Sequence, residues 1–163
     1  MDSSKVQKAL NEQINAEMFS AYQYLAMSAY LEDQNFPGMA RWMRSQAREE
    51  MVHAMKIYDY IHERGGTVDL AAIAQPEAAY GTPLATFETG LAHEKKVTAM
   101  IHKLYELATD EKDYPTQLML QWFIDEQVEE EASFGQVVER FRMAGDAPWA
   151  LLALDGQLGA RQE

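Results

Sequence analysis

The sequence Arg48-Glu49-Glu50-Met51-Val52-His53 sets the first constraint on this protein, because it holds a carboxylate and an imidazole three residues apart. On a helix, Glu50 and His53 lie side by side on one face. Oxygen and nitrogen ligands together suit iron, manganese or zinc. The same spacing arises by chance in a chain with 26 acidic residues. Its interpretation therefore depends on whether other parts of the chain supply matching ligands.

Apolar residues recur at three- and four-residue steps over most of the chain, a spacing typical of amphipathic helices. The first such stretch has no proline or glycine from Ser4 to Asp33. About 30 helical residues span roughly 45 Å, a length that favours an elongated bundle. The helices are expected at about residues 4–34, 37–64, 83–110, 115–144 and 147–158.

The segment Thr67–Pro83 is a long link with two prolines and a glycine. A structureless loop of this length is uncommon inside a compact domain, but a crossover along a helix bundle explains it. The other two connections between long helices are short, so each joins two antiparallel helices. The sequence thus predicts an all-α fold: a four-helix bundle with one long crossover and a short C-terminal fifth helix. We expect a single domain over residues 1–163.

The composition excludes several classes of function. Cysteine is absent, so disulfides, thiolate zinc sites and iron–sulfur clusters are excluded. The net charge of −12 disfavours nucleic-acid binding and favours cations as partners. The N-terminus does not look like a signal peptide, and no apolar run approaches the length of a membrane span. We therefore expect a cytoplasmic protein.

A metal site in the core requires a carboxylate on the first helix at the level of Glu50. The first turn is centred near residue 35, so this partner should lie near residue 20, and Glu17 is available. The second hairpin turns near residue 112 and places Glu94 level with Glu130.

The two halves of the chain also match at a constant offset of 77 residues. This offset relates Glu17 to Glu94 (94 − 17 = 77), and it also relates Glu50 to Gln127 and His53 to Glu130. Polar residues thus recur at one level on all four helices. Several buried carboxylates at one level repel each other strongly in a low dielectric, and a pair of cations offsets that repulsion. The sequence therefore predicts a dinuclear metal centre.

On these residues the chain resembles the non-haem bacterial ferritins over essentially its whole length. The resemblance implies one iron held by Glu17, Glu50 and His53 and a second held by Glu50, Glu94 and Glu130, with Glu50 bridging. It further implies that Gln127 lies beside the second iron and interacts with bound oxygen species. By the same resemblance, the residues that match a nearby third iron site are Glu49, Glu126 and Glu129, together with Glu130.

The second half departs from a symmetric di-iron site, because it reads Gln127-Val128-Glu129-Glu130 where bacterioferritins repeat Glu-x-x-His. Fewer ligands should hold the second iron more weakly, which suits iron that passes on to a mineral.

Several other residues have two interpretations. Tyr24 matches a tyrosine near the centre and has either a redox role or a packing role with its hydroxyl bonded to a carboxylate. Trp122 on an apolar stripe is more often packing. Met51 matches the haem-binding methionine of bacterioferritins, but with ten methionines a surface or interface role is favoured, so haem is not expected. The remaining histidines, expected at the surface or an interface, are His62, His93 and His102.

The resemblance implies oxidation of Fe(II) by dioxygen or peroxide, a ferroxidase activity, and storage of ferric mineral in a hollow shell of about 24 subunits. The fifth helix would line the four-fold contacts of that shell, and the acidic turn near Asp110 would guide cations.

Four alternatives stay open from the sequence. One is a haem-binding bacterioferritin. A second is a non-storage di-iron oxidase or peroxidase of the rubrerythrin kind, although no cysteine is present for its usual second iron centre. A third is a twelve-subunit DNA-protecting mini-ferritin, which lacks a fifth helix. The fourth, from a different class, is a metal-free helical interaction bundle.

Overall fold

A computed structural model describes residues 4–145 and 147–160 of the chain. These residues form helices and loops without a strand. The helices are α1 (Ser4–Asp33), α2 (Pro37–Glu63), α3 (Pro83–Asp110), α4 (Tyr114–Ala144) and α5 (Pro148–Gly159). The all-α bundle with a short C-terminal helix is confirmed. Over the described ranges, none of these helices combines the length and apolar character needed to cross a membrane.

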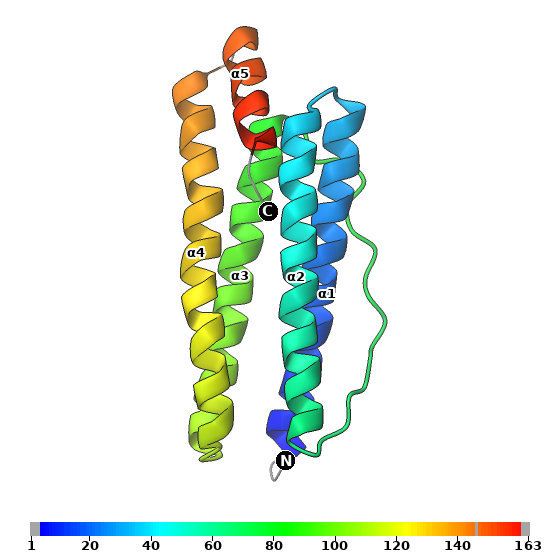
Figure 1. Cartoon of the computed structure of the whole chain (residues 1–163), viewed down its shortest axis with the longest axis vertical. Coiled ribbons are helices and arrows are strands. Elements are labelled where there is room, and N and C mark those ends of the chain that lie inside the picture. Colours follow the sequence, from blue (N-terminus) through cyan, green and yellow to red (C-terminus); the bar gives the residue numbers. More distant parts are fainter. Residues whose placement is uncertain (1–3, 146, 161–163) are drawn as a thin grey trace.

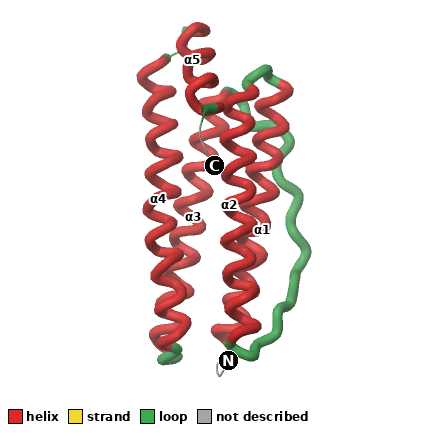
Figure 2. Tube along the Cα trace, in the orientation of Figure 1, coloured by secondary structure: helices red, strands yellow, loops and turns green. Residues whose placement is uncertain are grey.

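The four long helices stand side by side as two antiparallel hairpins, α1 with α2 and α3 with α4 (Figure 1). The segment between α2 and α3 runs back along the whole bundle beside α1, as Figure 2 shows in green. Because of this crossover, α2 and α3 run in the same direction. The short α5 lies at one end of the bundle and packs mainly on α2 (Figure 1).

Polar side chains of α1 fasten the crossover. Asn11 Nδ2 donates to the carbonyl of Thr67 at 3.1 Å, and the amide of Asp69 donates to Asn11 Oδ1 at 2.8 Å. At the other end, Tyr30 and the backbone of Gly81 exchange hydrogen bonds. These bonds satisfy backbone groups that a long loop otherwise leaves to water, so the link is ordered without a helix or strand of its own.

Local sequence explains where the helices of the second hairpin begin and end. Thr82 caps α3, where its hydroxyl accepts from the amide of Ala85, and Asp113 caps α4 by accepting from the amide of Thr116. Lys112 takes a left-handed backbone conformation (φ 57°) in the turn between them. Arg64 at the end of α2 lies 3.0 Å from the Asp113 carboxylate and joins the two hairpins at this end of the bundle.

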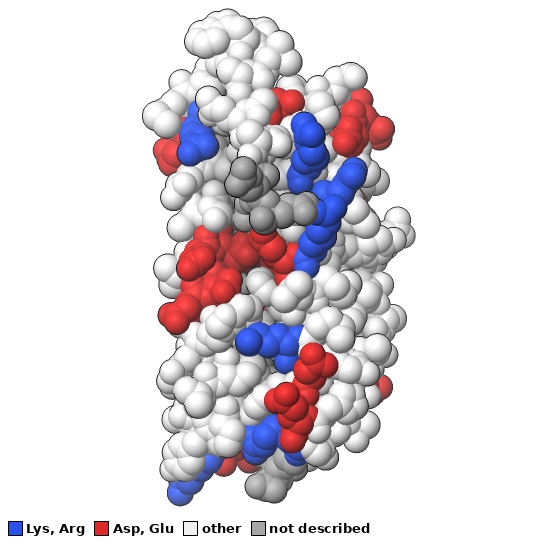
Figure 3. Space-filling view, in the orientation of Figure 1, with Lys and Arg blue, Asp and Glu red and all other residues white. Residues whose placement is uncertain are grey.

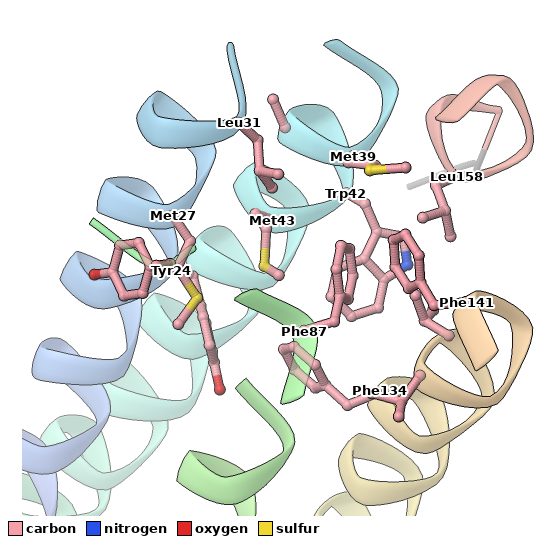
Figure 4. Close-up of a cluster of buried hydrophobic side chains, with 14 of the residues drawn as sticks. Tyr24, Met27, Leu31, Met39, Trp42, Met43, Phe87, Phe134, Phe141 and Leu158 are labelled. Carbon is pink, nitrogen blue, oxygen red and sulfur yellow. The ribbon is translucent and has the colours of Figure 1, made fainter. Parts of the chain in front are cut away.

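The apolar core is divided into two clusters along the bundle axis. One cluster, shown in Figure 4, includes Tyr24, Trp42, Phe87 and Phe134. The other cluster lies nearer the opposite end and is formed by buried residues that include Leu10, Ile57, Ile101 and Phe123. On each helix the predicted ligand positions fall between these two clusters. Buried polar side chains thus occupy a layer with apolar packing above and below it.

Gly38 allows α5 to approach α2 closely. A Cβ atom at this position would lie 1.9 Å from the backbone oxygen of Asp155. Next to it, the amide of Met39 donates to Asp155 Oδ1 at 2.8 Å. The contact between α2 and α5 therefore requires glycine at position 38.

We expect Gly38→Ala to destabilise the folded chain by about 1–3 kcal/mol, because the backbones of α2 and α5 must separate and the Asp155 bond must break. Denaturant unfolding measures the change. Gly135→Ala is the matched control, since a Cβ there has no neighbour within 4 Å and helix propensity favours alanine. Equal stability of the two variants would contradict the account of the α5 contact.

Candidate metal centre

Two groups of buried side chains meet in the middle of the bundle. Ligand atoms of Glu17, Glu50 and His53 lie within 4.8 Å of one another, and so do those of Glu50, Glu94 and Glu130. All five side chains are buried. Glu50 belongs to both groups, so its two carboxylate oxygens lie where one side chain can bridge two ions. The ligands come from all four long helices.

Neutral amides orient three of these carboxylates. Gln127 Nε2 donates to Glu94 Oε2 at 3.1 Å, which joins α4 to α3. Gln46 Nε2 donates to Glu130 Oε2 at 2.6 Å, which joins α2 to α4. Within α1, Gln13 Nε2 donates at 2.8 Å to the Oε1 atom of Glu17, one helical turn further along. Such partners fix the orientation of metal ligands.

Sequence reasoning did not single out Gln13 and Gln46. Each is a polar residue on the buried face of its helix, four residues before a predicted ligand. A buried polar residue one turn from Glu17 or Glu50 is the feature of the sequence that indicates a partner for a ligand. The partner itself can be named only when the facing helix is placed, because Gln46 bonds to a residue 84 positions away.

Tyr24 is fully buried, and its hydroxyl donates a short hydrogen bond to Glu94 Oε1. Burial, followed by the charges of Glu94 and Glu50, raises the pKa of the Tyr24 phenol well above its ordinary value. The phenol therefore stays protonated and acts as a donor. Its position beside Glu94 suits both interpretations that the sequence left open, a packing role and a redox role.

Buried polar atoms at the centre lack hydrogen-bond partners among the described residues. They include Glu17 Oε2, Glu50 Oε1 and His53 Nδ1. An unsatisfied buried polar group costs roughly 1–3 kcal/mol, and a charged one costs more. A pair of divalent cations would satisfy these atoms and offset the carboxylate charges together, so the donor set fits iron well.

The pKa values of the buried carboxyls also indicate a site for cations. Burial raises the pKa of Glu17 to about 7. Burial, then the charges of Glu17, Glu94 and Glu130, raises the pKa of Glu50 well above its ordinary value, and burial also raises the pKa of Glu94. Without a cation, the carboxyls of Glu17 and Glu50 therefore hold protons up to higher pH than free glutamate does. Cation binding must therefore release protons.

His53 is neutral at physiological pH, because burial, and to a smaller extent the charge of Lys56, lowers its pKa to about 4. Its Nδ1 atom lies 3.4 Å from Glu50 Oε2, so at neutral pH this contact is not an ion pair. A neutral imidazole is the form that binds metals. Trp122 packs edge-on against the His53 ring at a centroid distance of 5.4 Å and limits its rotation. The packing expected for Trp122 therefore includes a contact with this candidate ligand.

The residues of the predicted third site lie near one another on the α2 and α4 side. Burial, then the charges of Glu129 and Glu49, raises the pKa of Glu126. Figure 3 shows acidic side chains gathered at mid-height over α4 and toward α2. Within the described part of the chain, however, Glu49, Glu126 and Glu129 do not form a group whose ligand atoms lie within 4.8 Å. The third site stays a prediction.

Met51 and the remaining histidines differ in how far they are buried. Met51 is 43% exposed on α2, and both His62 and His102 are also exposed. His93 is half-buried, with Nε2 2.7 Å from Ser20 Oγ, and its expected place at the surface or an interface stays a prediction. Its sequence neighbour Glu94 is a candidate ligand, but spacing alone gave no reason to place the His93 ring inside.

A four-helix bundle with carboxylates and one histidine projecting into its core defines the class of dinuclear carboxylate proteins. The ferritin-like domain family matches residues 7–144. A bacterial non-heme ferritin of Bacteroides fragilis is 45% identical over 161 residues, which cover 99% of this chain and 100% of that protein. A bacterial non-heme ferritin of Staphylococcus aureus is 40% identical, with coverage of 99% and 97%.

Solved structures agree with these relatives. An open pore ferritin from the hyperthermophilic archaeon Archaeoglobus fulgidus superposes with a TM-score of 0.98 at 48% identity, and the match covers 99% of this chain and 100% of that chain. The chain belongs to the ferritin family. The resemblance that its residues suggested is confirmed.

Proposed function

We propose that this protein stores iron and that its metal centre is a ferroxidase site. The observation that carries the proposal is the position of Glu50, whose carboxylate belongs to both buried ligand groups. A side chain placed in this way can hold two ferrous ions at one short separation. Iron is the substrate of the reaction and the stored cargo.

Glu17 and His53 would complete the first iron position, and Glu94 and Glu130 the second. Each ferrous ion gives up one electron, and the pair supplies the two electrons that reduce dioxygen to hydrogen peroxide or peroxide to water. Gln127 holds Glu94, and Gln46 holds Glu130, so the second pair of ligands keeps its orientation before iron arrives. The surrounding apolar clusters exclude bulk water and strengthen the electrostatic attraction for the cations.

A proton is released for each protonated carboxyl that binds iron, since burial raises the pKa of Glu17 and of its neighbours. Tyr24 donates to Glu94 and is placed to take part in electron transfer at the second iron. Glu49, Glu126 and Glu129 carry charge on the adjacent surface, where a third iron would leave toward the mineral.

Storage requires a closed assembly, and we propose a homo-oligomer of about 24 subunits in the cytoplasm. Exposed apolar side chains on α1, α2 and the crossover support an interface between copies, and they include Leu25, Met51 and Ile73. On α5, Trp149 is 76% exposed and is available for contacts near its end of the bundle.

Size-exclusion chromatography combined with an iron-oxidation assay tests the proposal. A particle of roughly 440 kDa, from about 24 chains of 18.5 kDa, that oxidises many ferrous ions per subunit is the expected result. A monomer or dimer would exclude storage, and a particle without Fe(II) oxidation would exclude the ferroxidase site. A metal-free interaction bundle predicts neither property.

The asymmetry of the centre leads to a prediction about turnover. Replacing Gln127 by Glu and Glu130 by His gives the second half the Glu-x-x-His pattern of the first half. We expect this double variant to retain both irons after oxidation and to oxidise several-fold fewer ferrous ions per subunit, because an added ligand slows transfer to the mineral. Iron per subunit after desalting measures retention. Asp125→Asn, at an exposed position of α4, is the control, and equal retention in all three proteins would contradict the interpretation.

A further inference from the structure

An open cavity of about 740 Å³ lies between α1, the crossover and α3, on a side of the bundle that the proposed function does not use. Most of its lining surface is apolar, and the lining residues include Phe19, Val97 and Met100. Charged residues such as Glu88 and Lys96 also line it. Because apolar surface predominates, the cavity can admit small neutral molecules.

The imidazole of His93 stands between this cavity and the metal centre. His93 lines the cavity, and its Nε2 atom lies 2.7 Å from the hydroxyl of the fully buried Ser20. Its ring meets the Phe19 ring at a centroid distance of 5.7 Å and the Tyr24 ring edge-on at 5.9 Å. Tyr24 in turn bonds to Glu94. The His93 ring thus separates the cavity from a side chain in contact with a candidate ligand.

The contacts of His93 hold its ring in one position, between the cavity and Tyr24. The Ser20 bond fixes one edge of the ring, and two aromatic side chains pack against it. A ring of this size can rotate about its side-chain bonds without breaking the helix, because its partners are side chains and not backbone. Rotation of the ring would let a small molecule pass His93 toward the metal centre, and a bulky molecule would be held back in the cavity.

We propose that the cavity is the route by which the oxidant reaches the di-iron centre, and that the His93 ring limits the size of the oxidant that enters. The inference rests on the proposed ferroxidase function. Its chemistry is a two-electron reduction of a hydroperoxide, ROOH + 2 Fe(II) + 2 H⁺ → ROH + H₂O + 2 Fe(III), in which the O–O bond breaks and each iron loses one electron. Dioxygen, which is smaller and neutral, uses the same path.

The test compares a small and a bulky hydroperoxide as oxidants of protein loaded anaerobically with Fe(II). Stopped-flow absorbance gives the rate with hydrogen peroxide and the rate with cumene hydroperoxide for the wild type and for His93→Ala. We expect the ratio of the cumene hydroperoxide rate to the hydrogen peroxide rate to rise at least 10-fold in the variant. A purely structural role of His93 beside Tyr24 would change both rates together and leave the ratio unchanged, which overturns the proposal.

A second variant obstructs the cavity without touching His93. Thr89 is exposed on α3 and lines the cavity, so Thr89→Trp should place an indole ring in it and slow oxidation by hydrogen peroxide several-fold. Thr109→Trp is the matched control, because Thr109 is also exposed on α3 and both threonine hydroxyls bond to the carbonyl four residues earlier. Equal rates in the two tryptophan variants would place the route elsewhere and overturn the proposal. A wild type that does not oxidise Fe(II) refutes the proposed function itself, whereas an active wild type with an unchanged ratio refutes only the route.

Discussion

Glu50→Gln should lower the initial rate of Fe(II) oxidation by roughly 100-fold while the subunits still fold and assemble. Outer-shell partners of metal ligands already change affinity or activity by about 10–100-fold. Glu50 is the one residue common to both ligand groups of the described chain, so its replacement by a neutral amide weakens both iron positions at once. Initial rates under air, measured by the absorbance of Fe(III), give the effect.

The same variant should be more stable than the wild type in the absence of metal, by about 1–3 kcal/mol at alkaline pH. A glutamine side chain has the shape of a protonated glutamate, and it removes a charge that Glu17, Glu94 and Glu130 repel. Glu106→Gln, at an exposed position of α3, is the control and should change neither property. Loss of activity together with loss of stability in the Glu50 variant would show that Glu50 supports the fold and not the iron.

The metal-free protein should lose stability as the pH rises through the neutral range, and Glu17 provides the clearest measurement of this effect. Burial raises the Glu17 pKa from 4.5 to about 7, so the folded state binds this proton more tightly than the unfolded state does. Its contribution is fully present below pH 4.5 and is lost between pH 4.5 and about 7. A shift of this size corresponds to about 3 kcal/mol as an order of magnitude.

The titration of His53 changes the stability of the metal-free protein in the opposite direction with pH. Its pKa falls from 6.5 to about 4, so stability is full above pH 6.5 and is lost as the pH falls toward 4. The two effects oppose each other in the wild type. The difference in unfolding free energy between Glu17→Gln and the wild type isolates the carboxyl: it should be near zero at about pH 4.5 and should rise to about 3 kcal/mol in favour of the variant by about pH 8. A difference that does not change with pH would contradict this account.

Ferrous ions should reverse the order of stability at about pH 7.5. Under anaerobic conditions, ligand at about 1,000 times its dissociation constant stabilises a folded protein by about 4.1 kcal/mol, which exceeds the advantage of about 3 kcal/mol that the metal-free variant has. The wild type should gain this stabilisation and Glu17→Gln much less, because the variant lacks one ligand of the first iron. Thermal unfolding with and without Fe(II) separates the two cases.

The sequence predicts the fold because one local rule and one long-range rule agree. Apolar periodicity sets the helices, and the short turns at residues 34–36 and 111–113 fix which helices are antiparallel. The 77-residue offset then relates the two hairpins without any knowledge of their packing. The expected helix bounds differ from the observed bounds by at most one residue at any end, a difference that is common at helix ends.

Contacts in the layer around the ligands are harder to predict. The bond between Gln46 and Glu130 joins α2 to α4, and the bond between Ser20 and His93 joins α1 to α3. Both depend on how far each hairpin rotates about its long axis, which apolar spacing defines only within the width of a helix face. Glu50 and His53 avoid this difficulty, because their relative position is set within a single helix.

Crystals of the protein soaked in ferrous salt under air, with diffraction recorded on both sides of the iron absorption edge, test the central claim most directly. We expect two anomalous scattering peaks inside each subunit, one contacted by Glu17 and His53 and the other by Glu94 and Glu130, with Glu50 between them. Iron found only on the protein surface, with no peak between these five side chains, would contradict it.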